Sequence, residues 1–246
     1  MAWSSSHPRL EPVIHFPAGA SSRASNFFPA AAEPRRGRRT HNLKRMKIPL
    51  FPLDIVLFPG AVLPLHIFEE RYKEMIGECI DRRRAFGVVR AQRDGLAVVG
   101  CTAQIVRLLE KYADGRMDIL CQGQERFEIE SLDSSRSFLQ AEVDLYEDHE
   151  EPAGRLQRQE CVALHFEALD LIGSDGMNPP LNLDLPVSFQ LAWSAPSDLG
   201  FKQELLATRS DAERTTRLVA FYQSILPKLR SGAEAGRAAI RNGHIM

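Results

Sequence analysis

The sequence predicts an α+β fold in which a β-rich N-terminal part with one inserted helix precedes a C-terminal helical bundle. Three observations support this prediction. Residues 48–72 are apolar but contain repeated prolines, which lack a backbone donor and exclude one plain central strand. After Phe86, apolar and polar side chains alternate with a period of two, which is typical of strands. Beyond residue 150 the apolar spacing becomes three to four, which is typical of one-sided helices.

The proline-rich segment should contain two short strands that are separated by a turn at residues 58–60, followed by a helix that starts near Leu65. From Phe68 onward apolar residues recur every three or four positions, so one face of this helix should be buried. An arginine triplet at residues 82–84 follows, where cations complement the helix dipole. We expect the triplet to be solvated.

Turn signals separate the strands that follow. They are Asp94-Gly95, Asp114-Gly115 and Ser134-Ser135. Antiparallel strands of this kind can close into a small barrel, which avoids long open edges. The alternation is clearest at residues 139–145, which predicts a strand with one buried face.

Four helices are expected in the C-terminal part. The first should end at Gly173, and an extended connection at Pro179-Pro180 leads to a second helix after Asp184, with Pro186 in its first turn. A third, short helix spans residues 201–207. Residues 210–213 have capping-box spacing and begin the last helix, which Pro227 should bend or end early. The residues expected on buried faces are Leu156, Val162, Phe166, Leu169 and Ile172 in the first helix and Phe189, Ala192 and Trp193 in the second.

These patterns divide the chain into an extension (1–45), a β-rich part (46–148), a helical bundle (149–231) and a flexible tail (232–246). The extension is rich in Ser, Pro and Arg and has no sustained period, so we expect it to be disordered. Its composition matches an organelle transit peptide. We favour the simpler interpretation that the extension is an inert tail or that the start has been placed too far upstream, with translation beginning at Met46.

The charge is unevenly distributed. The extension carries eight Lys or Arg and two acids, whereas the rest of the chain carries 23 basic and 30 acidic residues. An acidic body lacks the attraction to phosphate that dominates nucleic-acid affinity, so nucleic-acid binding is disfavoured. No apolar run approaches the ~18–20 residues of a membrane span. We expect a cytoplasmic protein, or an organellar one if the extension is a transit peptide.

Cysteine and histidine residues do not predict a metal or cofactor site. The four cysteines form no Cys-x-x-Cys pair and are expected to be buried free thiols. His66 lacks the second histidine of a metalloprotease helix, and His165 borders an apolar helix face, where it should be a packing residue. His149 lies in the acidic run at residues 147–151, which we interpret as a solvated linker or, less simply, a weak cation site.

The proline-rich opening resembles the start of the substrate-binding N-terminal domain of ATP-dependent Lon proteases, which also occurs as a stand-alone protein and within cereblon. The opening is the specific part, because its Pro and Gly positions recur in order. The resemblance covers roughly residues 47–230 and implies a PUA-like pseudo-barrel followed by helices. Further matches are Phe86-Gly87-Val88-Val89, residues 99–105, Asp114-Gly115, residues 123–129, residues 139–143, residues 202–206 and Ala212-Glu213-Arg214.

The catalytic elements of the full protease are not found in this sequence. ATP hydrolysis requires Gly-x4-Gly-Lys-[Ser/Thr], and peptide cleavage requires a serine activated by lysine in a protease domain. The resemblance therefore implies a non-enzymatic module that binds unfolded or exposed polypeptide segments, with service as an adaptor for a separate ATP-dependent protease as a finer hypothesis. Two alternatives remain open: a hydrolase or small-ligand enzyme that uses the barrel mouth, and an RNA-binding barrel, which the acidic body disfavours.

Polypeptide capture requires exposed apolar surface with a polar rim. Phe58, Pro59 and Leu65 are the predicted apolar contacts. Glu69, Glu70 and Arg71 are the predicted charged rim. The competing interpretation places the first three in the core or in turn geometry and the last three on the solvent face of a helix.

Overall fold

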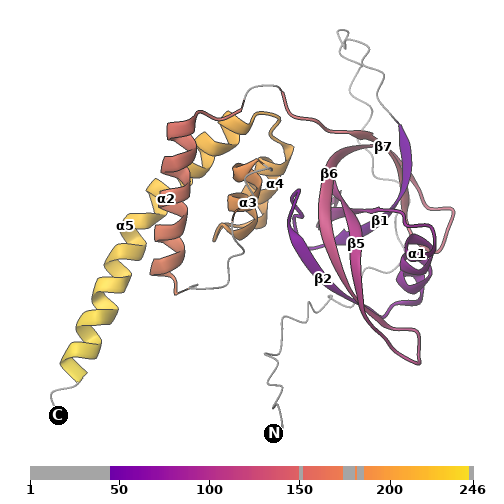
Figure 1. The fold of residues 1–246 in the computed structure, drawn as a ribbon, viewed down its shortest axis with the longest axis horizontal. Coiled ribbons are helices and arrows are strands. Elements are labelled where there is room, and N and C mark those ends of the chain that lie inside the picture. Colours follow the sequence, from indigo (N-terminus) through magenta and orange to yellow (C-terminus); the bar gives the residue numbers. More distant parts are fainter. Residues whose placement is uncertain (1–44, 150–151, 174–180, 182–185, 244–246) are drawn as a thin grey trace, which may run out of the picture. The chain divides into compact units, whose positions relative to one another are not determined.

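The computed structural model describes residues 45–149, 152–173, 181 and 186–243, with side chains as far as Glu234 (Figure 1). The predicted α+β class is confirmed. The extension, which is predicted to be disordered, and the connection predicted at Pro179-Pro180 both lie outside the described residues. The predicted domain boundaries remain predictions. The elements are β1 (Met46–Leu53), β2 (Val62–Ile67), α1 (Glu70–Asp81), β3 (Phe86–Gln92), β4 (Gly95–Leu96), β5 (Val99–Lys111), β6 (Met117–Asp133), β7 (Gln140–Leu145), α2 (Arg155–Leu171), α3 (Val187–Ser194), α4 (Leu199–Ala207) and α5 (Asp211–Gly243).

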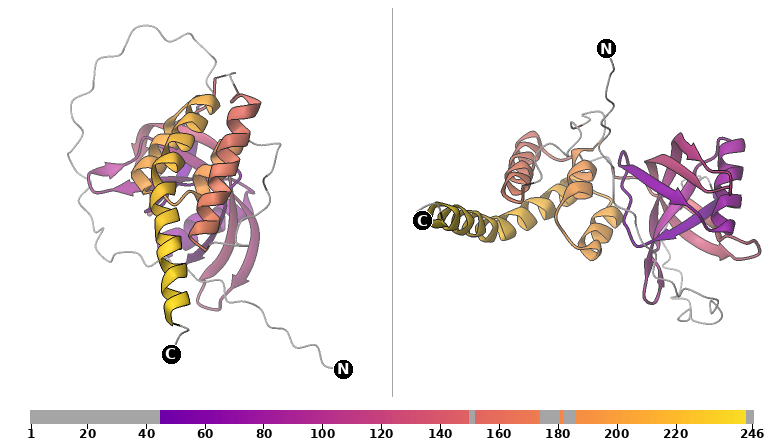
Figure 2. Two further views of the ribbon diagram at one scale, coloured as in Figure 1. Left: turned by 90° about the vertical axis from the view of Figure 1, so that its left-hand side faces the viewer. Right: turned by 90° about the horizontal axis from the view of Figure 1, so that it is seen from below.

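Strand pairing closes on itself. β1 pairs with β7, β7 with β6, β6 with β5 and β5 with β3, all antiparallel, and β3 returns to β1 in parallel. This ring is the arrangement that a pseudo-barrel requires, and it leaves few free edges. β2 and β4 lie outside the ring and pair with β6 and β3. In Figure 2, α1 lies with the strands, whereas α2 to α5 lie together.

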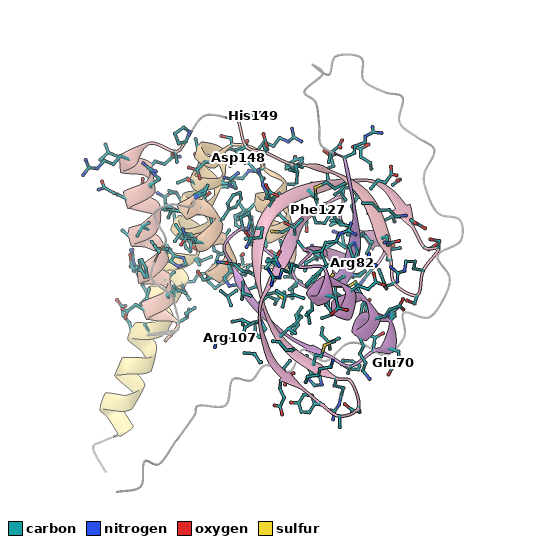
Figure 3. The ribbon with its side chains drawn as sticks, turned by 45° about the vertical axis from the view of Figure 1, so that its right-hand side comes forward. Glu70, Arg82, Arg107, Phe127, Asp148 and His149 are labelled. Carbon is teal, nitrogen blue, oxygen red and sulfur yellow. The ribbon has the colours of Figure 1, made fainter. Side chains whose placement is uncertain are left out.

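Glycines in the family-like motifs make room for Phe127. A Cβ at Gly87 would lie 2.8 Å from the Phe127 ring, and a Cβ at Gly100 would lie 2.7 Å from the Val88 carbonyl oxygen and closer still to that ring. Phe127 is fully buried and is labelled in Figure 3. These motifs therefore encode close packing around one aromatic side chain.

The predicted helix start near Leu65 is wrong, because β2 occupies that position and α1 begins at Glu70. Within β2, burial alternates residue by residue, as it does in a strand with one buried face. Pro64 is tolerated because β2 pairs only with β6 in the described part of the chain, so proline's missing donor is not needed by a second neighbour. The buried face of α1 matches its predicted spacing and consists of Tyr72, Met75, Ile76 and Cys79.

The predicted buried face of α2 is partly wrong. Leu156 is 81% exposed, and Phe166 and Ile172 are also exposed. The residues that α2 buries are Cys161, His165, Ala168 and Leu169. The predicted end of the helix is confirmed, because Gly173 has a φ of +73°, a value that glycine adopts readily.

His165 is a satisfied packing residue, as predicted. Its Nδ1 lies 2.6 Å from the Tyr222 hydroxyl of α5, and its Nε2 lies 3.3 Å from Ser194 Oγ of α3. Both ring nitrogens are therefore used in joining three helices.

Acid should destabilise the protein through His165. Burial lowers the pKa of His165 from 6.5 to about 4. Below pH 6.5 the histidine of the unfolded chain binds a proton, whereas the buried His165 of the folded chain stays neutral down to about pH 4. The contribution of His165 to the free energy of unfolding is therefore complete above pH 6.5 and is lost as the pH falls to about 4. The difference corresponds to roughly 3 kcal/mol. Urea unfolding between these pH values should show a smaller loss of stability for His165→Gln than for the natural chain, and equal losses would contradict this role.

The remaining helices begin close to their predicted positions. Asp198 accepts a hydrogen bond from the Phe201 amide (3.0 Å) at the start of α4, and Ser210 Oγ accepts one from the Glu213 amide (3.2 Å) at the start of α5. Pro227 is predicted to bend the last helix or to end it early, but α5 continues through Pro227 to Gly243, so the early end is wrong and the bend stays a prediction. Proline removes one intrahelical hydrogen bond, which this helix tolerates.

The four cysteines, Cys79, Cys101, Cys121 and Cys161, are free and buried, as predicted. Burial raises the pKa of Cys79 to about 11 and that of each of the other three to about 12. Thiols of this kind are packing groups rather than nucleophiles at neutral pH.

Candidate functional site

The three predicted apolar contacts are buried. Phe58 is 0% exposed, Leu65 is 8% exposed, and Pro59 is also buried. The Phe58 ring lies 6.2 Å from the Phe189 ring of α3, so it joins the strands to the helices. A partner cannot reach these residues in this conformation, and their burial supports the competing interpretation of core and turn geometry.

The three predicted rim residues lie at the start of α1. Glu70 and Arg71 are exposed and Glu69 is half-buried. Arg71 Nη2 lies 2.7 Å from Glu69 Oε2, and Lys73 Nζ lies 2.8 Å from Glu70 Oε1. These side chains are accessible, although each already has a local partner of opposite charge.

Exposed apolar side chains gather instead on β5. Val106, Leu108 and Leu109 are 50%, 42% and 50% exposed. We call these three residues the β5 strip. The pairing of β5 with β6 shifts register twice here, and Val106 and Leu109 are the residues without a partner on β6. Such bulges re-aim side chains and often lie beside functional sites.

The β5 strip lies on an open edge. β3 pairs with β5 only as far as Ala103, and among the described residues no strand pairs with the same edge of residues 104–111. On the other side of β6 lies β2 (Figure 1). Val62 of β2 is also exposed. Natural sheets rarely leave a long apolar edge uncovered, so this edge is a candidate interaction surface.

A polar network joins β2, β6 and the residue that follows β5. His66 Nδ1 lies 2.5 Å from Asp118 Oδ1, and the Tyr112 hydroxyl donates to Asp118 Oδ2 (2.7 Å). The hydrogen bond to Asp118, with smaller effects of burial and nearby carboxylates, raises the pKa of Tyr112 to about 12. The described residues contain no group of three or more His, Cys, Asp or Glu that could hold a metal ion. The network therefore ties the strands together at the end of the β5 strip.

A buried charge cluster joins the strands to the helices. Asp148, labelled in Figure 3, lies between β7 and α2. It accepts hydrogen bonds from Arg126 of β6 and from Arg214 of α5, where its oxygens lie 2.8 and 2.5 Å from Arg214 Nη1 and Nη2. Arg126 is 4% exposed and Arg214 is 0% exposed. Both guanidinium groups also donate to the Thr208 carbonyl oxygen (2.7 and 2.8 Å). One carboxylate therefore pairs with two buried cations, and Asp211 provides a second carboxylate 3.5 Å from Arg214, so that two negative charges balance two positive ones.

The prediction that residues 147–151 form a solvated linker is wrong at Asp148. The pKa of Arg126 is lowered overall, mainly because the group is buried. The charge of Asp148 opposes this shift, and the charge of Arg214 adds to it. Arg126 and Arg214 both lie in motifs that resemble the family, but nothing in the sequence showed that they face each other. His149 is exposed, and its amide donates to the Arg209 carbonyl oxygen (2.8 Å).

The fold and surface together define an α+β domain with a ring of strands, a tightly joined set of helices and an exposed apolar strip. Residues 47–228 match the family model for the substrate-binding domain of ATP-dependent protease La (LON). The chain belongs to this family.

Individual relatives agree with the family model. The Lon protease of Cytophaga hutchinsonii is 26% identical over 193 residues, which are 70% of this chain and 23% of that protein. The Lon protease of Parabacteroides distasonis is 34% identical over 110 residues, which are 41% of this chain and 13% of that protein. The chain thus spans less than a quarter of the length of either protease.

Solved structures support the fold. The Lon N-terminal domain protein from Xanthomonas campestris is 26% identical, with a TM-score of 0.58 over 71% of this chain and 98% of that chain. The N-terminal domain of the Mycobacterium avium complex Lon protease, at 18% identity and a TM-score of 0.54, covers 72% of this chain and 98% of that chain and shows the same fold. In the described ranges, no helix is both long enough and apolar enough to cross a membrane.

Proposed function

We propose that this chain is a non-catalytic polypeptide-binding module that captures unfolded or exposed segments of other proteins. Membership of the substrate-binding family supports this proposal. The observation that carries it is the β5 strip, where three large apolar side chains stand at about half exposure along an open edge. Apolar burial supplies affinity without direction, which suits a surface that accepts many sequences.

The predicted contacts take different roles in this proposal. Phe58, Pro59 and Leu65 are buried, so they are not proposed as contacts of the bound segment. Glu69, Glu70 and Arg71 remain proposed rim residues that a bound chain would reach at the start of α1. The contacts proposed for the bound segment itself are Val106, Leu108 and Leu109.

Polar substitution of the two leucines should weaken polypeptide binding. We expect L108S/L109S to raise the Kd for a fluorescent, reduced and alkylated model protein by roughly tenfold or more, because both side chains lose apolar area that binding would bury. Fluorescence anisotropy measures this change directly.

Leu156→Ser provides the matched control, because Leu156 is more exposed than either leucine but lies on α2. It should leave the Kd unchanged within about twofold. Equal weakening by both variants would indicate non-specific adhesion. No weakening by L108S/L109S, in a protein whose circular dichroism is unchanged, would remove the β5 strip from the proposal.

Service as an adaptor for a separate ATP-dependent protease is a finer part of the proposal, as is a cytoplasmic location. The relatives are whole Lon proteases, and this chain matches only a small part of each. An adaptor should accelerate degradation of the same model protein by a purified Lon protease in the presence of ATP. No observation in the described residues favours the enzymatic or RNA-binding alternative over polypeptide binding.

A further inference from the structure

The exposed end of β5 has a charge pattern that is complementary to itself in the antiparallel direction. Residues 106–111 read Val-Arg-Leu-Leu-Glu-Lys, and all six are exposed. Rotation about a two-fold axis between Leu108 and Leu109 places Arg107 of one copy opposite Glu110 of a second copy. We propose that two copies of this chain associate through this segment, side by side and antiparallel.

Each contact occurs twice in such a pair. Two-fold symmetry gives two Arg107–Glu110 contacts and two Leu108–Leu109 contacts, because the same patch serves both copies. Opposite charges and apolar pairs are the cross-strand neighbours that stabilise antiparallel pairing. The ends match less well, since Val106 faces Lys111, whose long aliphatic stem can cover it.

The charged members of this segment are available. Arg107, Glu110 and Lys111 form no ion pair within the described part of the chain. The carboxylate of Glu110 also interacts with the Tyr112 hydroxyl through its charge and a side-chain hydrogen bond, and both effects raise the pKa of Tyr112. Arg107, labelled in Figure 3, comes from the exposed part of β5. Arg107 and Glu110 are three positions apart, one on each side of the two leucines, and this order favours a partner strand that runs in the opposite direction.

The two bulges limit the size of this interface. Extra residues at Val106 and Leu109 disturb the regular ladder, which is one way in which sheet edges avoid open-ended addition. The pairing is therefore confined to a short segment and relies on side chains. An interface of this size belongs to the weak, concentration-dependent class.

Association would also cover the β5 strip. If the proposed function is correct, a second copy and a bound polypeptide (the client) compete for Leu108 and Leu109. The apparent affinity for the client would then be highest when the protein is dilute and monomeric. This consequence rests on the proposed function, whereas the dimer itself does not.

Sedimentation equilibrium of the full chain over a wide concentration range, without any client, tests the dimer. Arg107→Glu and Glu110→Arg should each raise the dimer dissociation constant roughly tenfold or more, because each creates two like-charge contacts by symmetry. The double variant R107E/E110R should return the constant to within about threefold of the natural value. Arg93→Glu, the same reversal at an exposed residue near β4, should leave it unchanged.

Three outcomes would overturn the proposal: a natural chain that stays monomeric throughout, a double variant that fails to restore association, or assemblies that keep growing beyond two copies. If the dimer behaves as expected but the apparent affinity for the bound polypeptide does not change with the concentration of this protein, the dimer stands and the placement of the polypeptide on the β5 strip fails. If L108S/L109S weakens client binding while the natural chain stays monomeric, the proposed function stands without the dimer.

Discussion

Asp148→Asn is expected to lower the free energy of unfolding by about 3 kcal/mol or more, although Asp148 lies in a connection rather than in a helix or strand. The substitution leaves Arg126 without a carboxylate partner and leaves Arg214 with Asp211 alone. A buried guanidinium cannot lose its proton to escape this penalty. The aromatic face of Phe189, 3.9 Å from the Arg214 guanidinium carbon and 5.0 Å from that of Arg126, offsets only part of it.

Urea unfolding at neutral pH measures this loss, and two further variants show its cause. Arg126→Met combined with Asp148→Asn should recover part of the stability, because the uncompensated charge is removed together with its partner. Glu167→Gln breaks the exposed pair with Arg230, in which two nitrogens lie 2.7 and 3.0 Å from the carboxylate, and should cost far less stability than Asp148→Asn, because solvent screens the pair. A loss at Asp148 no larger than the loss at Glu167 would show that the buried cluster is not important for stability.

The fold class could be predicted from the sequence because it depends on local periodicity. Alternation after Phe86 and the later spacing of three to four identified the strands and helices without knowledge of their partners. Leu65 shows the limit of this approach. The residues around it are mostly apolar and include prolines, so the sequence shows no alternation there. Only the pairing of β2 with β6 reveals that burial alternates with a period of two.

The candidate site was harder to predict, because its parts are defined by distant partners. Asp148 meets residues 22 and 66 positions away, so its place in an acidic run suggested a solvated linker. The β5 strip depends on register shifts, and the sequence carries one signal of them. Apolar residues stand in adjacent pairs at 105–106 and 108–109, and two adjacent apolar residues in an alternating strand are what a bulge produces.

Gly123→Ala is expected to lower the free energy of unfolding by about 3 kcal/mol or more, since this position faces backbone rather than a flexible side chain. A Cβ at Gly123 would lie inside the contact distance of the Phe58 carbonyl oxygen and 3.2 Å from Leu57 Cγ. The turn would have to move away from β6. Two backbone hydrogen bonds would then weaken, from the Gly60 amide to the Gly123 carbonyl (2.8 Å) and from the Gly123 amide to the Ala61 carbonyl (2.9 Å).

Gly77→Ala supplies a control of opposite sign for the same substitution. Gly77 lies inside α1, and a Cβ there meets nothing within 4 Å, so alanine should stabilise the protein by about 0.5–1 kcal/mol through helix propensity. Displacement of the turn by Gly123→Ala should also move Phe58 away from Phe189 and expose amides near the junction of strands and helices to hydrogen exchange. If Gly123→Ala were as harmless as Gly77→Ala, the glycine in the family-like motif at residues 123–129 would have to serve something other than the approach of this turn. Destabilisation without faster exchange near Phe58 would place the strain in β6 itself.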